Sequence, residues 1–239
     1  MDFEAFKEEM NKNIQSIDIK LTEGQIKAFY NYMDLLIEKN KVMNLTGITE
    51  PKEIILKHFI DSLTISKYIE KNKKVIDVGT GAGFPGIPLK ISKDSLQLIL
   101  LDSLNKRINF LNEVIEQNKL TNIKAIHGRA EDMARNKEYR EAFDIAISRA
   151  VAPLNILLEY MMPFVKTNGF CICMKGNNCE EEIEKSKNAI KILGGEIEKI
   201  EKFKLANSDN NRTIIIIKKN KQISNQFPRN AGIPTKKPL

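Results

Sequence analysis

Residues 75–91 have the sequence VIDVGTGAGFPGIPLKI, and this stretch decides the fold. It begins with β-branched residues, which are typical of a short buried strand. Four glycines then follow within eight residues and allow the backbone to turn tightly and to approach a ligand closely: Gly79, Gly81, Gly83 and Gly86. Apolar residues resume after the glycines and predict a helix whose first N–H groups lie at the carboxyl end of the strand. The stretch therefore predicts a ligand-binding edge.

Two classes of ligand fit such a loop. Residues 81–86 match the dinucleotide pattern G-x-G-x-x-G, although a single match of this kind is weak. Asp77, two residues before the first glycine, would place a negative charge near a bound pyrophosphate, which Coulomb repulsion disfavours. The same carboxylate suits S-adenosylmethionine, which carries an ammonium and a sulfonium and no phosphate. The sequence thus favours a methyl donor over a dinucleotide.

The remainder of the chain alternates between strands and helices after residue 75. Strands are expected at 75–78, 95–101, 123–127, 143–148 and 169–174, and two later segments, 196–205 and 212–219, form a hairpin. This alternation predicts an α/β fold with a mostly parallel seven-stranded sheet and helices on both faces.

The chain divides into three parts by pattern and charge. Residues 1–70 contain helical patterns at 2–14, 22–40 and 53–68 and form an N-terminal helical cap, and residues 71–220 form the core. Residues 221–239 form a basic tail. The last 22 residues of the chain, 218–239, have six basic side chains and no acidic one. Such a tail favours RNA or another polyanion, but a solvated terminus has the same composition.

Several candidate site residues follow strands. Asp102 ends the second strand, where a carboxylate can bind a ribose hydroxyl of either cofactor. Glu131, next to Ala130, follows the third strand and can accept from an adenine amino group, or it is simply an acid at a helix N-terminus. Arg149 follows the fourth strand, facing the glycine loop, unless it serves as a structural ion-pair partner. His58, within a helical segment, is interpreted as structural.

Composition excludes several other classes of protein. The chain has 239 residues, of which 42% are hydrophobic and 29% charged, and no apolar run is long enough to span a membrane. Its N-terminus lacks the apolar core of a signal peptide, which indicates a cytoplasmic protein. Cys171, Cys173 and Cys179 have no histidine near them in sequence, so we expect buried thiols and no metal site.

Short motifs along nearly the whole chain carry a family resemblance. They are N-L-T at 44–46, H-x-x-D-S-L at 58–63, D-V-G-T-G-A-G-F-P-G-I-P-L at 77–89, K-R-x-x-F-L at 106–111, R-A-E at 129–131, S-R-A-V-A at 148–152, K-G at 175–176 and P-R-x-x-G-x-P at 228–234. Together they resemble the bacterial small-subunit ribosomal RNA guanine-N7 methyltransferases, the glucose-inhibited division protein B family. Thr80 stands where serine is frequent and Asp102 where glutamate is common, which keeps the hydroxyl and the charge.

This resemblance implies a Rossmann-like class I methyltransferase that uses S-adenosylmethionine. The residues that would hold the cofactor are Gly79, Phe84, Ala130, Glu131 and Arg149, and the geometry of the pattern adds Gly81 and Asp102. The implied substrate is guanine 527 of 16S ribosomal RNA, either free or in a small-subunit assembly particle. The candidate RNA-binding residues are Arg149, Lys175, Arg212 and Arg229. We expect a monomer.

Methylation of guanine N7 needs no general base, because N7 has an in-plane lone pair and no proton to lose. We therefore expect no catalytic base, and Arg149 is predicted to position the guanine or the cofactor. Three alternatives stay open: a methyltransferase of small molecules or proteins, an RNA-binding or cell-division accessory protein that binds the cofactor without catalysis, and a dinucleotide oxidoreductase.

Overall fold

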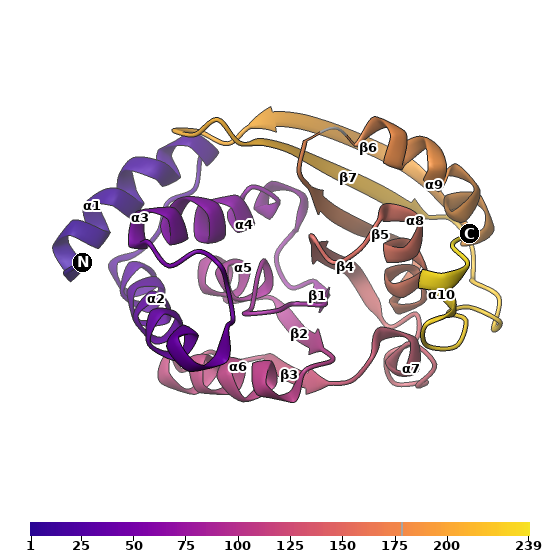
Figure 1. Ribbon diagram of the computed structural model, residues 1–239, viewed down its shortest axis with the longest axis horizontal. Coiled ribbons are helices and arrows are strands. Elements are labelled where there is room, and N and C mark those ends of the chain that lie inside the picture. The colour runs from indigo at the N-terminus through magenta and orange to yellow at the C-terminus, as the bar shows by residue number, and fades with distance from the viewer. Residues whose placement is uncertain (178) are drawn as a thin grey trace.

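The computed structural model describes residues 1–177 and 179–239, and within these ranges seven strands form one sheet (Figure 1). The strands are β1 (Lys74–Val78), β2 (Gln97–Asp102), β3 (Ile123–His127), β4 (Phe143–Arg149), β5 (Val165–Lys175), β6 (Gly195–Lys204) and β7 (Asn211–Lys219). Their order is β3-β2-β1-β4-β5-β7-β6. Strands β1 to β5 are parallel, and β7 is antiparallel to both β5 and β6. The predicted mostly parallel sheet with a final hairpin is confirmed.

Helices cover both faces of the sheet (Figure 1). They are α1 (Phe3–Ile14), α2 (Glu23–Met43), α3 (Pro51–Glu53), α4 (Asp61–Leu63), α5 (Gly86–Ser92), α6 (Asn105–Gln117), α7 (Ala130–Met133), α8 (Leu154–Met161), α9 (Glu180–Ile192) and α10 (Ile233–Lys236). One apolar cluster joins α1, α2, α5 and α6 to the sheet, and a second lies under α8 and α9 on the opposite face. The buried strands have apolar residues on both faces for this reason.

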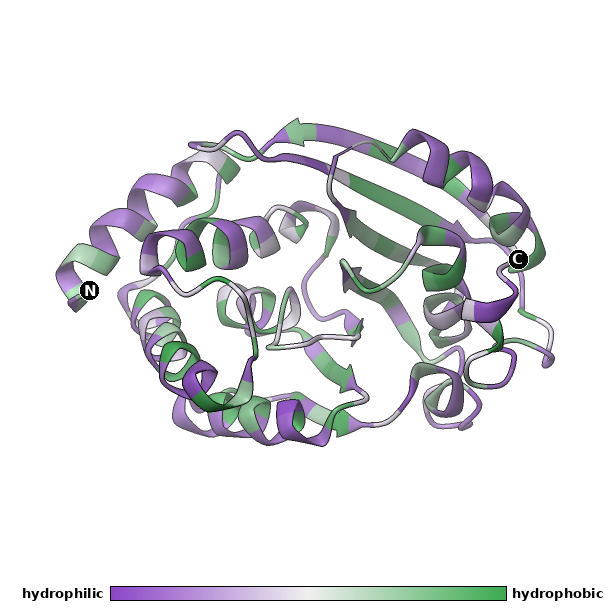
Figure 2. Cartoon of the chain, viewed as in Figure 1, coloured by the Kyte–Doolittle hydropathy of each residue, from purple (hydrophilic) through white to green (hydrophobic). Residues whose placement is uncertain are grey.

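Hydropathy distinguishes the central strands from the edge. Strand β7 contains four consecutive isoleucines, residues 214–217, all of them buried between β5 and the edge strand β6. Strand β6 instead has no buried residue, and most of its charged side chains face solvent. Figure 2 shows green along β5 and β7 and much more purple on β6. Charges on an edge strand discourage pairing with other chains.

The order of the strands creates a switch point beside β1. The chain passes from β1 outward to β2 and β3, and then returns to form β4 and β5 on the other side of β1. The connections therefore diverge at the carboxyl ends of β1 and β4, which leaves a crevice there. The glycine loop follows β1 at this point, so the fold places it at the crevice.

The N-terminal cap shares its core with the sheet. A capping box starts α2, since Thr22 Oγ1 accepts from Gln25 N at 3.2 Å and Gln25 Oε1 accepts from Thr22 N at 2.8 Å. Phe59 lies beside Phe29 of α2, with their ring centroids 5.0 Å apart. Phe59 belongs to a π-helical turn, Ile54–Ile60, that joins α3 to α4.

The C-terminal segment 221–239 is folded against α7 and α8, and is not the solvated terminus that composition alone allowed. Ile223 and Phe227 are buried. Arg140 donates to the carbonyl oxygens of Ile223, at 3.2 Å, and Phe227, at 2.8 Å. Arg229 pairs with Glu159 of α8 through Nη2 at 2.6 Å. In the two described ranges, no helix is long and apolar enough to cross a membrane.

Candidate functional site

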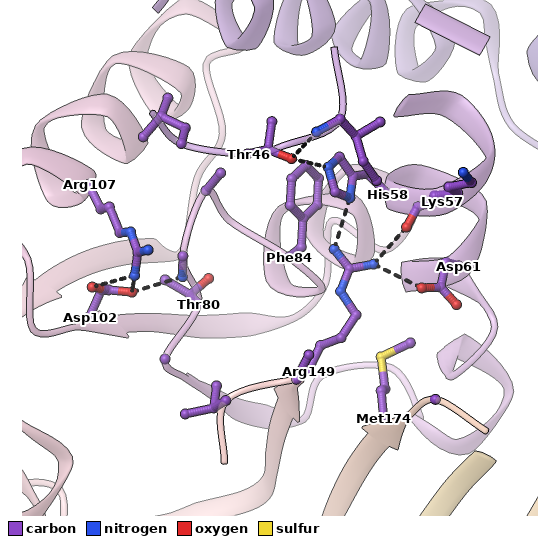
Figure 3. Close-up of a pocket in the computed structure, with 18 of the residues that line it drawn as sticks. Thr46, Lys57, His58, Asp61, Thr80, Phe84, Asp102, Arg107, Arg149 and Met174 are labelled. Carbon is purple, nitrogen blue, oxygen red and sulfur yellow. Dashed lines mark hydrogen bonds and ion pairs between the residues drawn. The ribbon is translucent and has the colours of Figure 1, made fainter. Parts of the chain in front are cut away.

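A cavity of about 670 Å³ opens at the carboxyl ends of β1, β2, β4 and β5. The glycine loop, the end of β2, the end of β4 and the end of β5 line it, together with the segment 45–61 from the cap. Figure 3 shows Asp102 and Arg107 on one side and Arg149, His58 and Asp61 on the other. The volume lies in the range of small-molecule and cofactor sites.

The glycine loop needs its glycines for backbone conformation. Gly79, Gly81 and Gly83 have φ angles of 72°, 64° and 102°, which side chains strongly disfavour. A Cβ on Gly86 would lie 2.4 Å from Leu100 Cδ2. The loop thus combines a left-handed backbone with close packing against β2.

Asp77 forms hydrogen bonds to the glycine loop from its buried side. Its Oδ2 accepts from Thr80 Oγ1 at 2.7 Å and from Gly86 N at 2.9 Å, and its side chain is fully buried. Asp77 is not among the cavity-lining residues, so the expectation that its charge faces the ligand is corrected: it shapes the loop instead. Burial raises the pKa of Asp77 to about 7, although the bonds from Thr80 and Gly86 act in the opposite direction.

The cap helix α2 supports the same loop from the other side. The Tyr32 hydroxyl donates to the Ala82 carbonyl, and the Tyr32 ring stacks on Phe84 with centroids 5.5 Å apart. A Cβ on Gly83 would lie 2.7 Å from Tyr32 Oη. Because Tyr32 is fully buried, the loop and the cap pack as one unit.

Asp102 lies at the cavity, and its carboxylate is bonded to the glycine loop. Its Oδ2 accepts from Gly81 N at 2.9 Å, and its Oδ1 accepts from Leu104 N at 3.0 Å. Arg107 Nη1 lies 3.1 Å from Oδ2. The carboxylate is therefore fixed at the carboxyl edge of the sheet, and its assignment to a cofactor ribose stays a prediction.

Arg149 belongs to a buried charge cluster opposite Asp102. Its Nη1 donates to Asp61 Oδ2 and to the Lys57 carbonyl, both at 3.1 Å, and its guanidinium lies 5.0 Å from the Phe84 ring centroid. Arg212 Nε donates to Asp61 Oδ1 at 2.9 Å. Asp61 thus joins two arginines, one from β4 and one from β7, and both line the cavity.

His58 also lines the cavity. The sequence pattern predicted a structural role for this residue and did not predict a position at the cavity. Its ring stacks on Phe84 with centroids 4.3 Å apart, and Nε2 lies 2.8 Å from Thr46 Oγ1. Burial, and to a lesser degree the charge of Arg149, lowers the pKa of His58 to about 3. The spacing H-x-x-D at 58–61 was the available signal, since it places His58 and Asp61 on the same side of one helical turn.

Lys175 lines the cavity with an ammonium that is already paired. Its Nζ lies 2.6 Å from both Glu182 Oε1 and the Ala152 carbonyl. The cavity therefore brings together most of the predicted site residues: Gly79, Gly81, Phe84, Asp102, Arg149, Lys175 and Arg212.

Three predicted residues do not line this cavity: Ala130, Glu131 and Arg229. Glu131 is buried, and its Oε1 accepts from Gly232 N at 3.4 Å. Arg229 is engaged with Glu159. Their assignment to cofactor or RNA stays a prediction.

The charges of the cavity suit an anionic partner. Among the lining residues that the structure describes, the cationic side chains are Lys57, Arg107, Arg149, Lys175 and Arg212, and the carboxylates are Asp61 and Asp102. Both carboxylates accept from arginine, and His58 is uncharged at neutral pH. Lys57 and Lys175 are paired with Glu53 and Glu182, which do not line the cavity. In the part of the chain that the structure covers, no group of acidic, histidine or cysteine side chains could hold a metal ion.

Comparisons with known proteins extend over nearly the whole chain. A family model described as "GidB: rRNA small subunit methyltransferase G" matches residues 25–214. A protein of Alkaliphilus oremlandii named ribosomal RNA small subunit methyltransferase G is 48% identical over 235 residues, which cover 98% of each chain. One of the same name from Acetivibrio thermocellus is 53% identical over 222 residues, covering 92% of this chain and 91% of that protein.

Solved structures share the fold at low sequence identity. M. jannaschii TYW2 in complex with AdoMet has a TM-score of 0.52 and 20% identity, covering 66% of this chain and 72% of that chain. A SAM-dependent methyltransferase from Aquifex aeolicus has a TM-score of 0.54 and 14% identity, covering 76% and 97%. These similarities establish the arrangement of strands and helices.

Proposed function

Because this chain belongs to the rRNA small subunit methyltransferase G family, we propose that it methylates N7 of one guanine in 16S ribosomal RNA. The family makes it an S-adenosylmethionine-dependent methyltransferase of small-subunit ribosomal RNA. The N7 atom, and guanine 527 as the target, are the finer parts of the proposal. A ribosomal RNA substrate would place the enzyme in the cytoplasm.

One observation carries the proposal: a single cavity joins a fixed glycine loop to a cluster of arginines. Asp102 and the Gly81 amide are fixed at one side, where a ribose would bind, and Phe84, stacked on His58, lines the cavity between the two sides. Arg149 and Arg212 are held at the other side by Asp61. The residues present therefore fit S-adenosylmethionine next to a nucleic-acid base.

The reaction requires little of the protein beyond the orientation of the two reactants. S-adenosylmethionine supplies a methyl group on a sulfonium, and the guanine N7 lone pair is already free to attack. Holding N7 in line with that methyl group converts a bimolecular step into an effectively unimolecular one. Arg149, fixed by Asp61 and the Phe84 ring, can orient the base without moving a proton. The uncharged, engaged His58 agrees with a site that needs no general base.

The target base must leave its helix to reach this cavity. In double-stranded RNA, N7 lies in the deep and narrow major groove, which side chains cannot enter. We therefore expect an unpaired or splayed-out guanine, with its flanking phosphates near Lys57, Arg149 and Arg212.

Methyl incorporation tests the proposal directly. Small-subunit ribosomal RNA from a strain lacking this protein is incubated with labelled S-adenosylmethionine and then cleaved chemically at N7-methylguanine. One new cleavage site is expected with the wild type, and a strongly reduced yield with Arg149→Ala. Lys187→Ala, an exposed lysine of α9, is the matched control and keeps full activity. Incorporation without cleavage, or into another acceptor, contradicts the N7 assignment.

A further inference from the structure

Thr46 lines the cavity in a rigid turn between α2 and α3. Asn40 Oδ1 accepts from Leu45 N at 2.6 Å and from Thr46 N at 2.9 Å. Asn40 Nδ2 donates to the Thr46 carbonyl at 2.9 Å. The side chain of Thr46 lies next to His58 and Phe84 in Figure 3, and all three line the cavity. Its position is therefore set by α2 and does not depend on a ligand.

A chain of hydrogen bonds fixes which way each group donates. Arg149 Nη2 lies 3.3 Å from His58 Nδ1, and a guanidinium can only donate, so Nδ1 is the acceptor. Burial beside Arg149 keeps the imidazole uncharged, which leaves its single N–H on Nε2. Nε2 lies 2.8 Å from Thr46 Oγ1 and therefore donates to it.

Thr46 Oγ1 receives a second hydrogen bond from the backbone. Ile48 N donates to it at 3.0 Å. A hydroxyl has two lone pairs and one hydrogen, so His58 and Ile48 use its acceptor capacity and only the O–H remains. Within residues 1–177 and 179–239, no group accepts from this hydroxyl. At the cavity Thr46 is thus a donor that cannot also accept.

We propose that the Thr46 hydroxyl donates to the carbonyl oxygen O6 of the target guanine and so selects guanine over adenine. This inference rests on the proposed N7 methylation. O6 lies next to N7 on the same edge of guanine, and a bond to O6 orients that edge without occupying the N7 lone pair. Adenine has an amino group in place of O6, and Thr46 has no lone pair left to accept from it. The Arg149–His58 pair positions the base indirectly, because it fixes the direction in which the Thr46 hydroxyl donates.

The test compares two substrates and three enzymes. Undermethylated small-subunit RNA is prepared with guanosine or with 2-aminopurine, which keeps N7 and lacks O6, at the target position. The wild type is expected to lose about ten-fold in kcat/KM on the 2-aminopurine RNA, the size of one lost hydrogen bond. Thr46→Val is expected to lose about ten-fold on guanosine and nothing more on 2-aminopurine. Thr46→Ser should behave as the wild type, and all three should bind S-adenosylmethionine equally.

Three results overturn the inference. They are equal wild-type rates on the two RNAs, an equal further loss by Thr46→Val on both, and weaker cofactor binding by Thr46→Val. If that variant does not fold, equal wild-type rates on the two RNAs still overturn the inference. Absence of N7-methylguanine from the wild-type reaction on guanosine RNA would instead contradict the proposed function itself.

Discussion

The partners of a buried carboxylate in this protein determine how costly that carboxylate is to ionise. Asp77 and Asp61 are both buried carboxylates, yet they differ in their partners. Asp61 faces two guanidinium groups, whereas Asp77 accepts only from a hydroxyl and a backbone amide, and its Oδ1 has no partner among the described residues. Neutral donors do not offset the desolvation of a carboxylate as fully as ions do. Asp77 is therefore costly to ionise, and Asp61 holds its neighbours in place.

Replacing Asp77 with asparagine should change how stability depends on pH. The pKa of Asp77 is about 7 in the folded protein and 3.8 in the unfolded chain, so the folded state binds more protons between these values. This residue's contribution to the free energy of unfolding therefore falls as pH rises from about 4 to about 7, by about 1 kcal/mol per pH unit. The Asp77→Asn variant has no carboxyl group at this position, so it lacks this pH-dependent contribution to the free energy of unfolding. Titration of His58 is common to both proteins and cancels in the difference.

Urea unfolding at pH 5, 6, 7 and 8 measures this effect. The stability of Asp77→Asn relative to the wild type should increase up to pH 7 and then level off. Parallel stability curves over the whole range would show that Asp77 is ionised throughout.

Asp61→Asn should impair methyl transfer more than cofactor binding. The substitution leaves Arg149 and Arg212 without their shared counter-ion, and truncating one partner of a buried charge pair costs about 3–5 kcal/mol. We expect the rate of methyl transfer to RNA to fall at least ten-fold, with a smaller change in the dissociation constant for S-adenosylmethionine. Asp34→Asn, an exposed position on α2, is the control. A larger loss in cofactor affinity than in rate would contradict a role at the RNA side.

At the scale of elements, the cap forms part of the wall of the cavity. Helix α2 supplies Tyr32 under the glycine loop, and the segment between α2 and α4 supplies Thr46, His58 and Asp61 to the cavity. A π-helical turn contains His58 and ends next to Asp61. Such turns often occur at functional sites, where they change the direction of side chains. The sheet provides the loop, and the cap determines what faces it.

Tyr32→Phe tests the coupling between cap and loop. The variant keeps the ring stacked on Phe84 and loses the hydroxyl that donates to the Ala82 carbonyl, which is then left unpaired in a buried place. We expect a loss of about 1–2 kcal/mol in the free energy of unfolding and a several-fold weaker affinity for S-adenosylmethionine. Tyr30→Phe removes a hydroxyl bond from the same helix to the Met1 carbonyl, away from the loop, and serves as control. Unchanged cofactor affinity in Tyr32→Phe would show that the loop keeps its shape without the cap.

At the scale of the whole molecule, the C-terminal segment closes the face of the sheet that α8 covers. Two of its buried residues, Ile223 and Phe227, belong to the apolar cluster under α8 and α9. Arg229 reaches Glu159, whose side chain is only 1% exposed, through both Nε and Nη2. Deleting the segment would therefore expose core and leave a buried charge, so point substitutions are the cleaner probe.

Arg229→Met should destabilise the fold by about 3 kcal/mol, because Glu159 is left as a buried carboxylate without a counter-ion and keeps only the bond from the backbone N–H of residue 229. Thermal unfolding measures this loss, and Arg129→Met, at an exposed arginine, should be near neutral. A double variant with Glu159→Gln should recover part of the stability. If the single variant is as stable as the wild type, the pair is dispensable. RNA affinity of the folded variant tests the sequence-based assignment of Arg229 to RNA contact.

The sequence by itself determined the order of strands and helices, the glycine loop and the place of Asp102, because these depend on local periodicity and on backbone freedom. Tertiary structure decided what joins the site. Arg149 and Arg212 are 88 and 151 residues from the Asp61 that fixes them, and no local pattern encodes such pairing. The tertiary structure likewise placed Asp77 beneath the loop, His58 at the cavity and the basic terminus on α8. Burial and ion pairing arise only when distant segments pack, and they set the charge and direction of each of these side chains.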